Sequence, residues 1–197
     1  MLKQSVLRGA AVLFAVQCLW AVPASANELS YSNLALGYEL REQDGANVRG
    51  STFELQFAVS QDLYITARRS DLEEESAIGG GVDDEWEDLG LGVGFHVPFT
   101  ETFDFYGEVE YRERDTETNG VSDSEDGFGV GIGLRQKLGK YFEYDTGVTV
   151  LSLKEQSTSE YHIGVRGFIR PAISLGARAT SSSRATGLYN LELRFDF

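Results

Sequence analysis

The residues best suited to chemistry are two histidines, because acid–base and nucleophilic catalysis need a His close to a carboxylate or a serine. The chain of 197 residues contains only His96 and His162. Glu160 and several serines lie near His162 in the sequence, but no spacing marks a catalytic triad. We therefore expect no enzymatic activity, and we expect each His to belong to a polar interior network.

Two acidic segments could bind Ca²⁺ or Mg²⁺ through carboxylate oxygens. The stretch from Asp71 to Asp88 carries nine acidic residues and no basic one. Residues 115–126 partly match a twelve-residue calcium loop, but Glu117 at the third position and Asp126 at the twelfth depart from that pattern. We interpret the first segment as a solvated external loop and the second as a coincidence. The expectation is no metal site and no cofactor.

The overall charge excludes further classes of protein. The chain has 31 acidic and 17 basic residues, a net charge of −14, which should repel nucleic-acid phosphates. A single Cys excludes a disulfide framework, and one Cys with two His nearly excludes structural zinc.

The N-terminal residues have the pattern of an export signal. Lys3 and Arg8 precede an apolar run over residues 9–22, and the small residues Ala24-Ser25-Ala26 follow. This order predicts a cleaved signal peptide over residues 1–26. A membrane anchor is the alternative, but the apolar run is short for a membrane-spanning helix.

The predicted mature domain, residues 27–197, alternates apolar and polar residues with a period of two. Successive side chains of a strand point to opposite faces, so this pattern predicts strands with one apolar face. A tilted strand crosses a membrane in about 9–11 residues. We predict an all-β, closed, antiparallel up-and-down transmembrane barrel of ten strands, with eight as the alternative. The alternating runs are 34–41, 52–59, 63–68, 89–97, 103–112, 128–135, 142–150, 161–166, 173–180 and 189–197.

The predicted connections alternate between short and long, which places all tight turns at one end of the barrel, as in membrane barrels. If the N-terminus lies at that end, His96 is expected near the short turns and His162 near the long loops, about 20 Å or more apart. The short links are 61–62, 98–101, 139–140 and 170–171. The long links are 42–48, 71–85, 115–125, 154–159 and 181–185.

Alternation alone does not decide which face points outward. A soluble barrel turns its apolar face inward, whereas a membrane barrel turns it towards lipid. The loop asymmetry and an aromatic C-terminus favour the membrane. So do aromatic residues near the predicted strand ends, as expected for interfacial girdles: Tyr31, Phe99, Phe103, Phe142, Tyr161 and Tyr189.

The polar face would then line the lumen. Its acidic and basic residues nearly balance, so we predict a network of ion pairs, with glycines at 90–94 and 129–133 leaving room for long Arg and Glu side chains. The predicted lumen network is Glu39, Glu54, Arg68, Glu108, Glu110, Arg112, Arg135, Glu143, Arg166, Arg178, Glu192 and Arg194.

The last strand resembles the assembly signal of Gram-negative outer-membrane β-barrels through Tyr189, Leu191, Leu193, Phe195 and Phe197. The resemblance implies recognition by the β-barrel assembly machinery, with periplasmic chaperones as escorts. Nearly the whole mature chain also resembles a family of small proteobacterial outer-membrane β-barrel proteins. The motifs are Leu29-Ser30-Tyr31, Leu36-Gly37-Tyr38, residues 60–64, residues 91–95, Asp126-Gly127-Phe128 and residues 131–135.

Two functions remain open. A barrel of ten strands has a backbone radius of roughly 10 Å, and inward Arg and Glu side chains fill much of it. The first expectation is therefore a porin-like monomer in the outer membrane with at most a narrow channel for ions or small solutes. The alternative is a plugged structural barrel that presents acidic loops to lipopolysaccharide, divalent cations or a partner. Outer-membrane lipid and lipopolysaccharide are expected partners in either case.

Overall fold

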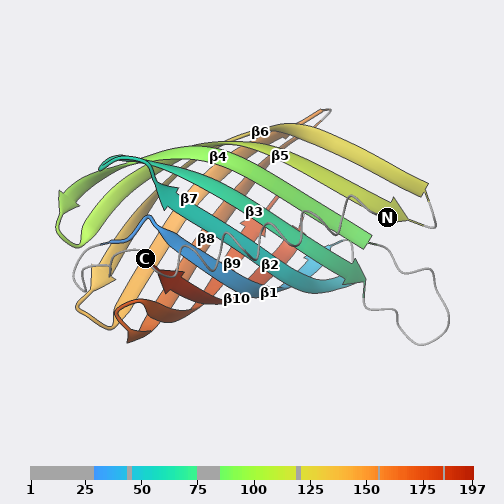
Figure 1. Cartoon of the computed structure of the whole chain (residues 1–197). Helices are drawn as coiled ribbons and strands as arrows, with labels where there is room; N and C mark the ends of the chain where they lie inside the picture. Colours follow the sequence, from blue (N-terminus) through green and yellow to red (C-terminus); the bar gives the residue numbers. More distant parts are fainter. Residues whose placement is uncertain (1–28, 44–45, 75–84, 119–120, 155, 184) are drawn as a thin grey trace, which may run out of the picture.

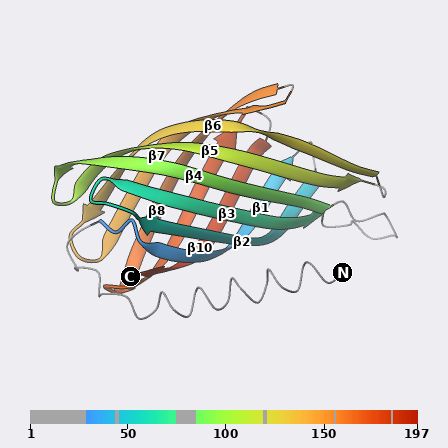
Figure 2. The same ribbon diagram turned by 45° about the horizontal axis from the view of Figure 1, so that its top comes forward.

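The computed structural model describes residues 29–197 apart from 44–45, 75–84, 119–120, 155 and 184. Within these residues ten strands form one closed antiparallel barrel (Figures 1 and 2). The prediction of ten strands is thus confirmed, whereas the signal peptide over residues 1–26 lies outside the described residues. The strands are β1 (Asn33–Gln43), β2 (Ala46–Ala58), β3 (Leu63–Glu74), β4 (Glu85–Thr100), β5 (Phe103–Thr118), β6 (Val121–Leu138), β7 (Phe142–Leu153), β8 (Gln156–Arg170), β9 (Ile173–Ser182) and β10 (Ala185–Asp196).

Each strand pairs with its neighbours in the chain, and β1 pairs with β10 to close the ring. Leu36 lies opposite Leu193 at this closure. Closure leaves no free strand edge, which a chain in hydrocarbon requires because unpaired backbone groups are costly there. In this order β6 is five strands from β1 in both directions, so the two strands lie on opposite sides of the barrel.

The two ends of the barrel differ. One end, here called the turn side, carries the links 59–62, 101–102, 139–141 and 171–172, and lies at the left of Figure 1. Phe197 also lies there, and its backbone N–H donates to the Ser32 carbonyl oxygen at 3.0 Å. In the turn between β6 and β7, Gly139 has a φ of 64°, a conformation that favours glycine. The opposite end is the loop side.

Several predicted long loops are strands in the structure. Residues 115–118 pair with residues 121–124, so the β5–β6 hairpin continues where a loop over 115–125 was predicted. The pair Asn119-Gly120 is a strong two-residue hairpin signal in the sequence that the prediction overlooked. The predicted link 42–48 is also mostly strand, because Gln43 pairs with Ala46. Among the strands drawn, β5 and β6 consequently reach furthest to the right in Figures 1 and 2.

The barrel has a charged interior and an apolar exterior. Its buried residues include Glu39, Arg112 and Glu143, whereas Val93 and Leu91 are more than half exposed on the outside. Exposed apolar area costs about 25 cal/mol per Å² in water, so this wall is suited to hydrocarbon rather than to water. The prediction that the apolar face points outward is confirmed. The part of the chain that the structure describes contains no helix long and apolar enough to cross a membrane.

Candidate functional site

The charged lumen is the candidate functional site, and its tightest part lies on the turn side. There the Glu143 carboxylate on β7 accepts hydrogen bonds from Arg135 at 2.8 Å, Arg166 at 2.5 Å and Arg194 at 3.1 Å. Glu143 is only 2% exposed. Because an unpaired buried charge is costly, each member of this Glu143 cluster depends on the others.

Two further carboxylates balance the excess positive charge of the Glu143 cluster. Asp196 lies 3.0 Å from the Nε atom of Arg194, and Glu192 pairs with Arg166. The aromatic ring of Phe168 lies beneath two cations, with Lys137 Nζ at 4.7 Å and the Arg194 guanidinium at 5.8 Å from its centre. Such cation–π contacts add attraction at a desolvated site. The turn side of the lumen is therefore closely packed.

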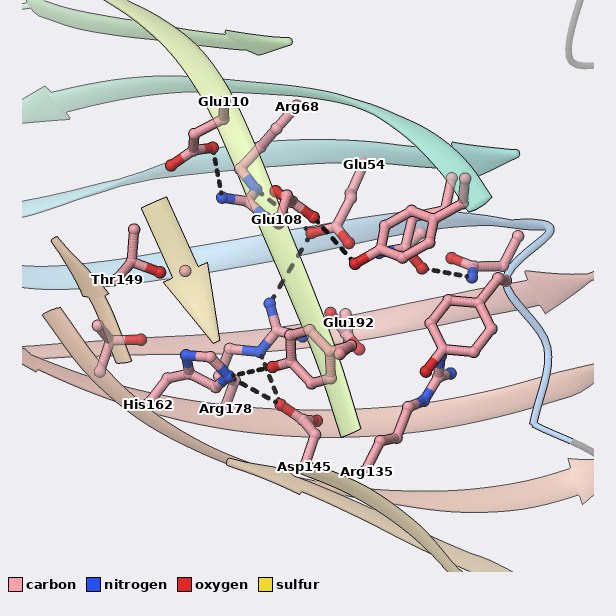
Figure 3. A pocket seen from close by; sticks show the side chains of 18 of the residues that line it. Glu54, Arg68, Glu108, Glu110, Arg135, Asp145, Thr149, His162, Arg178 and Glu192 are labelled. Carbon is pink, nitrogen blue, oxygen red and sulfur yellow. Dashed lines mark hydrogen bonds and ion pairs between the residues drawn. The ribbon is translucent and has the colours of Figure 1, made fainter. Parts of the chain in front are cut away.

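The middle of the lumen is bridged by longer contacts (Figure 3). Arg178 on β9 lies 3.8 Å from Glu54 on β2 and 3.7 Å from Asp145 on β7. Arg68 on β3 reaches the same Glu54 carboxylate at 3.3 Å. Glu108 accepts a hydrogen bond from the Tyr64 hydroxyl at 3.4 Å. These side chains cross the lumen rather than lining one wall.

The two histidines lie in separate contacts with carboxylates. His96 is 3.1 Å from Asp104, and His162 Nε2 lies 2.9 Å from the Tyr106 hydroxyl and 3.3 Å from Asp145. His162 stands near the middle of β8, so its predicted place at the long-loop end is wrong. One nitrogen of His162 faces both neighbours, which suits a structural hydrogen bond better than activation of a nucleophile.

The loop side holds a second set of ion pairs. Arg112 pairs with Glu110 at 2.5 Å and with Glu160, across the lumen on β8, at 3.3 Å. Nearby, Asp88 pairs with Arg114 at 2.6 Å. A chain of contacts continues from there to β1, where Arg41 joins Asp88 at 3.2 Å and Glu39 at 2.8 Å.

Two cavities remain between these contacts. One of about 140 Å³ lies in the middle of the lumen (Figure 3), and one of about 160 Å³ lies towards the loop side. Both are lined by Glu54, Arg68 and Arg178, so these side chains mark the boundary between them. Cavities of this size and polarity hold several waters but no large solute.

All of the predicted lumen residues face the interior, in one or more of the contacts and cavities described above. The prediction omitted Asp88 and Glu160, which form lumen ion pairs with arginines, and Asp104, which contacts His96. A signal for them was present, since each stands an even number of residues from an inward neighbour on the same strand. Which carboxylate meets which guanidinium could not be read in this way, because most partners lie on strands far apart in sequence.

Glycines on the inner face make room for large side chains of neighbouring strands. A Cβ atom at Gly94 would lie 2.1 Å from the ring of Tyr64, and one at Gly133 would lie 2.4 Å from the ring of Tyr106. At Gly129 the nearest atoms belong to Glu110, at 2.9 Å. The glycine rows thus accommodate two tyrosine rings as well as the predicted charged side chains.

The aromatic girdle is partly as predicted. Phe99 and Phe142 are exposed on the outer wall at the turn side, and Phe99 stacks on Phe103 with ring centres 5.6 Å apart. Tyr161 and Tyr189 are exposed on the outer wall as well. Tyr31 is not part of this girdle, because it is buried in the lumen with 5% exposure. Tyr31 lies two positions before Asn33, the first residue of β1. Because side chains alternate between the two faces, Tyr31 points inward, as Asn33 does.

The acidic segments lie mainly on strands. Residues 71–73 of β3 pair with residues 85–87 of β4, while residues 75–84 lie outside the described residues. Among the residues that the structure describes, no group of three or more His, Cys, Asp or Glu could hold a metal ion. The extended ends of β3–β6 enclose an acidic cleft of about 420 Å³, whose lining includes Glu73, Trp86, Glu87, Asp115 and Asp123.

The predicted assembly signal occupies β10 and the residue after it. Tyr189 and Leu191 are exposed on the outer wall, Leu193 and Phe195 are half-buried, and Phe197 follows the strand at the turn side. Recognition of this segment by an assembly machinery stays a prediction.

Comparison with known proteins bears on the fold. No protein-family model matches the sequence, and no curated protein matches it. Solved structures do resemble it. An outer membrane channel from Pseudomonas putida F1 is 8% identical, with 90% of this chain and 100% of that chain covered and a TM-score of 0.53.

Two other solved structures agree with this likeness. The NanC porin is 8% identical, with 84% and 99% of the two chains covered and a TM-score of 0.52. The beta domain of the Bordetella autotransporter BrkA is 12% identical, with 86% and 100% covered and a TM-score of 0.50. The chain therefore has the fold of outer-membrane β-barrels, and at the level of fold the resemblance noted in the sequence is confirmed.

Proposed function

We propose that this protein is an integral outer-membrane β-barrel, porin-like, with at most a narrow path for ions or small solutes. The observation that carries the proposal is the apolar outer wall around a charged lumen that retains two polar cavities. A wall of this kind is stable in a bilayer, and polar cavities inside it can hold water.

The lumen is too obstructed for large solutes. Contacts such as Arg178 with Glu54 and Arg112 with Glu160 join strands three places apart in the ring, so they run through the interior. A ten-stranded barrel has a backbone radius of only about 10 Å. Any path must therefore pass between ion pairs, which favours small hydrated ions.

A preference for cations should come from the loop side. The described lumen charges largely compensate one another, whereas none of the described residues that line the acidic cleft at the ends of β3–β6 is basic. A mouth lined by one sign of charge raises the local concentration of the opposite ion. The expected selectivity is thus moderate and sensitive to ionic strength.

Biogenesis and location are part of the same proposal. Residues 1–26 serve as a cleaved signal peptide, and the segment ending at Phe197 is recognised by the β-barrel assembly machinery after escort by periplasmic chaperones. The mature domain, residues 27–197, is a monomer among outer-membrane lipid and lipopolysaccharide, with no enzymatic activity and no nucleic-acid partner.

Exchange of the terminal aromatic tests the assembly proposal. Phe197→Ser should lower the amount of folded protein in the outer membrane, measured by heat-dependent gel migration of membrane fractions. Tyr161→Ser, at an exposed aromatic of β8, is the matched control and should assemble normally. Equal assembly of Phe197→Ser and the control would contradict the signal.

Planar-bilayer conductance of the purified, folded protein tests the channel. Small, reproducible openings with cation preference are expected. A silent bilayer with folding verified by gel migration would overturn the channel and favour the second candidate, a plugged barrel that acts through its surface. The acidic cleft is the observation that favours this candidate, and its partners would be lipopolysaccharide, divalent cations or another protein.

A further inference from the structure

The residues just before β1 enter the lumen from the turn side. Ser32 is held at the wall, where its carbonyl oxygen accepts from the Phe197 N–H at 3.0 Å and its hydroxyl accepts from the Ala58 N–H at 3.1 Å. Ser30 and Tyr31 precede this anchor, and Tyr31 is buried. The chain thus leaves the wall at Ser32 and turns inward.

Tyr31 contacts side chains from three different strands. Its ring stacks on His96 of β4, with centres 3.9 Å apart and planes 11° apart, and on Tyr64 of β3 at 5.0 Å. The Arg135 guanidinium of β6 lies 5.0 Å from the centre of the same ring. The Asp104 carboxylate lies 3.1 Å from His96 Nδ1, on the stacked imidazole.

The contact with β6 shows how far the segment reaches. Arg135 donates a hydrogen bond to the Ser30 carbonyl oxygen at 2.9 Å. Since β6 lies opposite β1 in the ring, Ser30 and Arg135 join opposite walls of the barrel. Arg135 also belongs to the Glu143 cluster, so the segment and the cluster meet as one layer across the turn-side end.

We propose that Tyr31, held by His96 and Arg135, is a stopper that closes the turn-side end of the lumen and thereby sets its permeability. This inference rests on the proposed narrow path, because it assigns the residue that limits that path. The Glu143 cluster projects from wall strands, whereas Tyr31 comes from a segment outside the strands and can be altered without a change in the wall. Removal of its ring opens space between His96 and Arg135 and joins the central cavity to the turn-side solvent.

The test compares single-channel conductance of the wild type, Tyr31→Ala and Tyr38→Ala in planar bilayers. Tyr38 is the matched control, because it lies on β1 and is 46% exposed on the outer wall. Tyr31→Ala should raise the conductance several-fold, and Tyr38→Ala should leave it unchanged. Tyr31→Phe keeps the stacked ring and should behave as the wild type.

The outcomes separate the stopper from the channel. A conducting wild type with higher conductance in Tyr31→Ala supports both, and an unchanged conductance overturns the stopper alone. A silent wild type with a conducting Tyr31→Ala supports the stopper and overturns an open resting path. Silence in both overturns both. If Tyr31→Ala does not fold by gel migration, His96→Ala removes the stacking partner instead and should raise conductance in the same way.

Discussion

The turn-side and loop-side halves of the lumen follow one alternating pattern but pack differently. On the turn side, Glu143 gathers three arginines within 3.1 Å, and Tyr31 adds a ring from outside the strands. On the loop side, Arg112 and its partners are joined in chains that leave a cavity of about 160 Å³. The difference teaches that inward polarity alone does not fill a barrel. The turn-side end of the lumen is closed because several arginines converge on one carboxylate and a segment from outside the strands adds an aromatic ring.

Loss of the Glu143 carboxylate should have the largest effect. Glu143→Ala leaves Arg135, Arg166 and Arg194 close together without their shared acceptor, and should lower the free energy of unfolding by about 3–5 kcal/mol. Glu160→Ala, on the loop side, should cost about 1 kcal/mol, because the Glu160 side chain is 22% exposed and pairs with one arginine, Arg112, rather than with three. Urea unfolding in detergent or lipid, followed by gel migration, measures both. Equal losses would remove the distinction between the two halves.

A charge on the outer wall should have the next largest effect. Ile132→Arg places a guanidinium in the apolar belt and should destabilise the barrel by about 2–4 kcal/mol. Val121→Arg, at the loop-side start of β6, should cost about 0–1 kcal/mol, since Val121 is 70% exposed at the far end of the hairpin, where we expect water rather than lipid. Unfolding of the two variants in lipid vesicles provides the comparison. A tolerated Arg at position 132 would mean that this face does not meet lipid.

Two glycines of β4 compare the packing of the halves directly. Gly94→Ala would bring a Cβ to 2.1 Å from the Tyr64 ring and should cost about 1–3 kcal/mol through overpacking. Gly90→Ala meets its nearest atom, a Glu110 carboxylate oxygen, at 3.5 Å and should change the stability by less than about 0.5 kcal/mol. Thermal unfolding of the paired variants checks the difference, and a larger loss for Gly90→Ala would reverse it.

The smallest effect is expected at the outer rim of the loop side. Arg69 pairs with Asp71 at 2.9 Å and Glu87 at 3.1 Å, but all three side chains are between 42% and 52% exposed. Arg69→Ala should therefore change the stability by about 0–1 kcal/mol, and less at high salt. Urea titrations at two salt concentrations measure this. A loss as large as that of Glu143→Ala would show that burial does not govern these pairs.

Much of this architecture follows from the period of two. It predicts ten strands, the outward apolar face and the inward charges, because successive side chains of a strand point to opposite faces. It also places Tyr31 inward, although its aromatic character suggested the girdle instead. The convergence of Arg135, Arg166 and Arg194 on Glu143 could not be predicted, since it depends on how far each strand is displaced along its neighbours around the ring. The extension of the β5–β6 hairpin could have been predicted from the Asn119-Gly120 pair, but a loop was predicted there instead.

The contacts that cross the lumen have a mechanical consequence. Several join strands three places apart: Arg41 with Asp88, Glu54 with Arg178, Arg112 with Glu160, Tyr106 with His162, and Arg194 with Glu143. Contacts of this kind, at different levels along the barrel axis, resist flattening of the barrel because each one limits the distance between two separated strands. The cross-section should therefore stay round under lateral pressure from the surrounding lipid. A barrel without these cross-lumen contacts should deform into an oval before its strands separate.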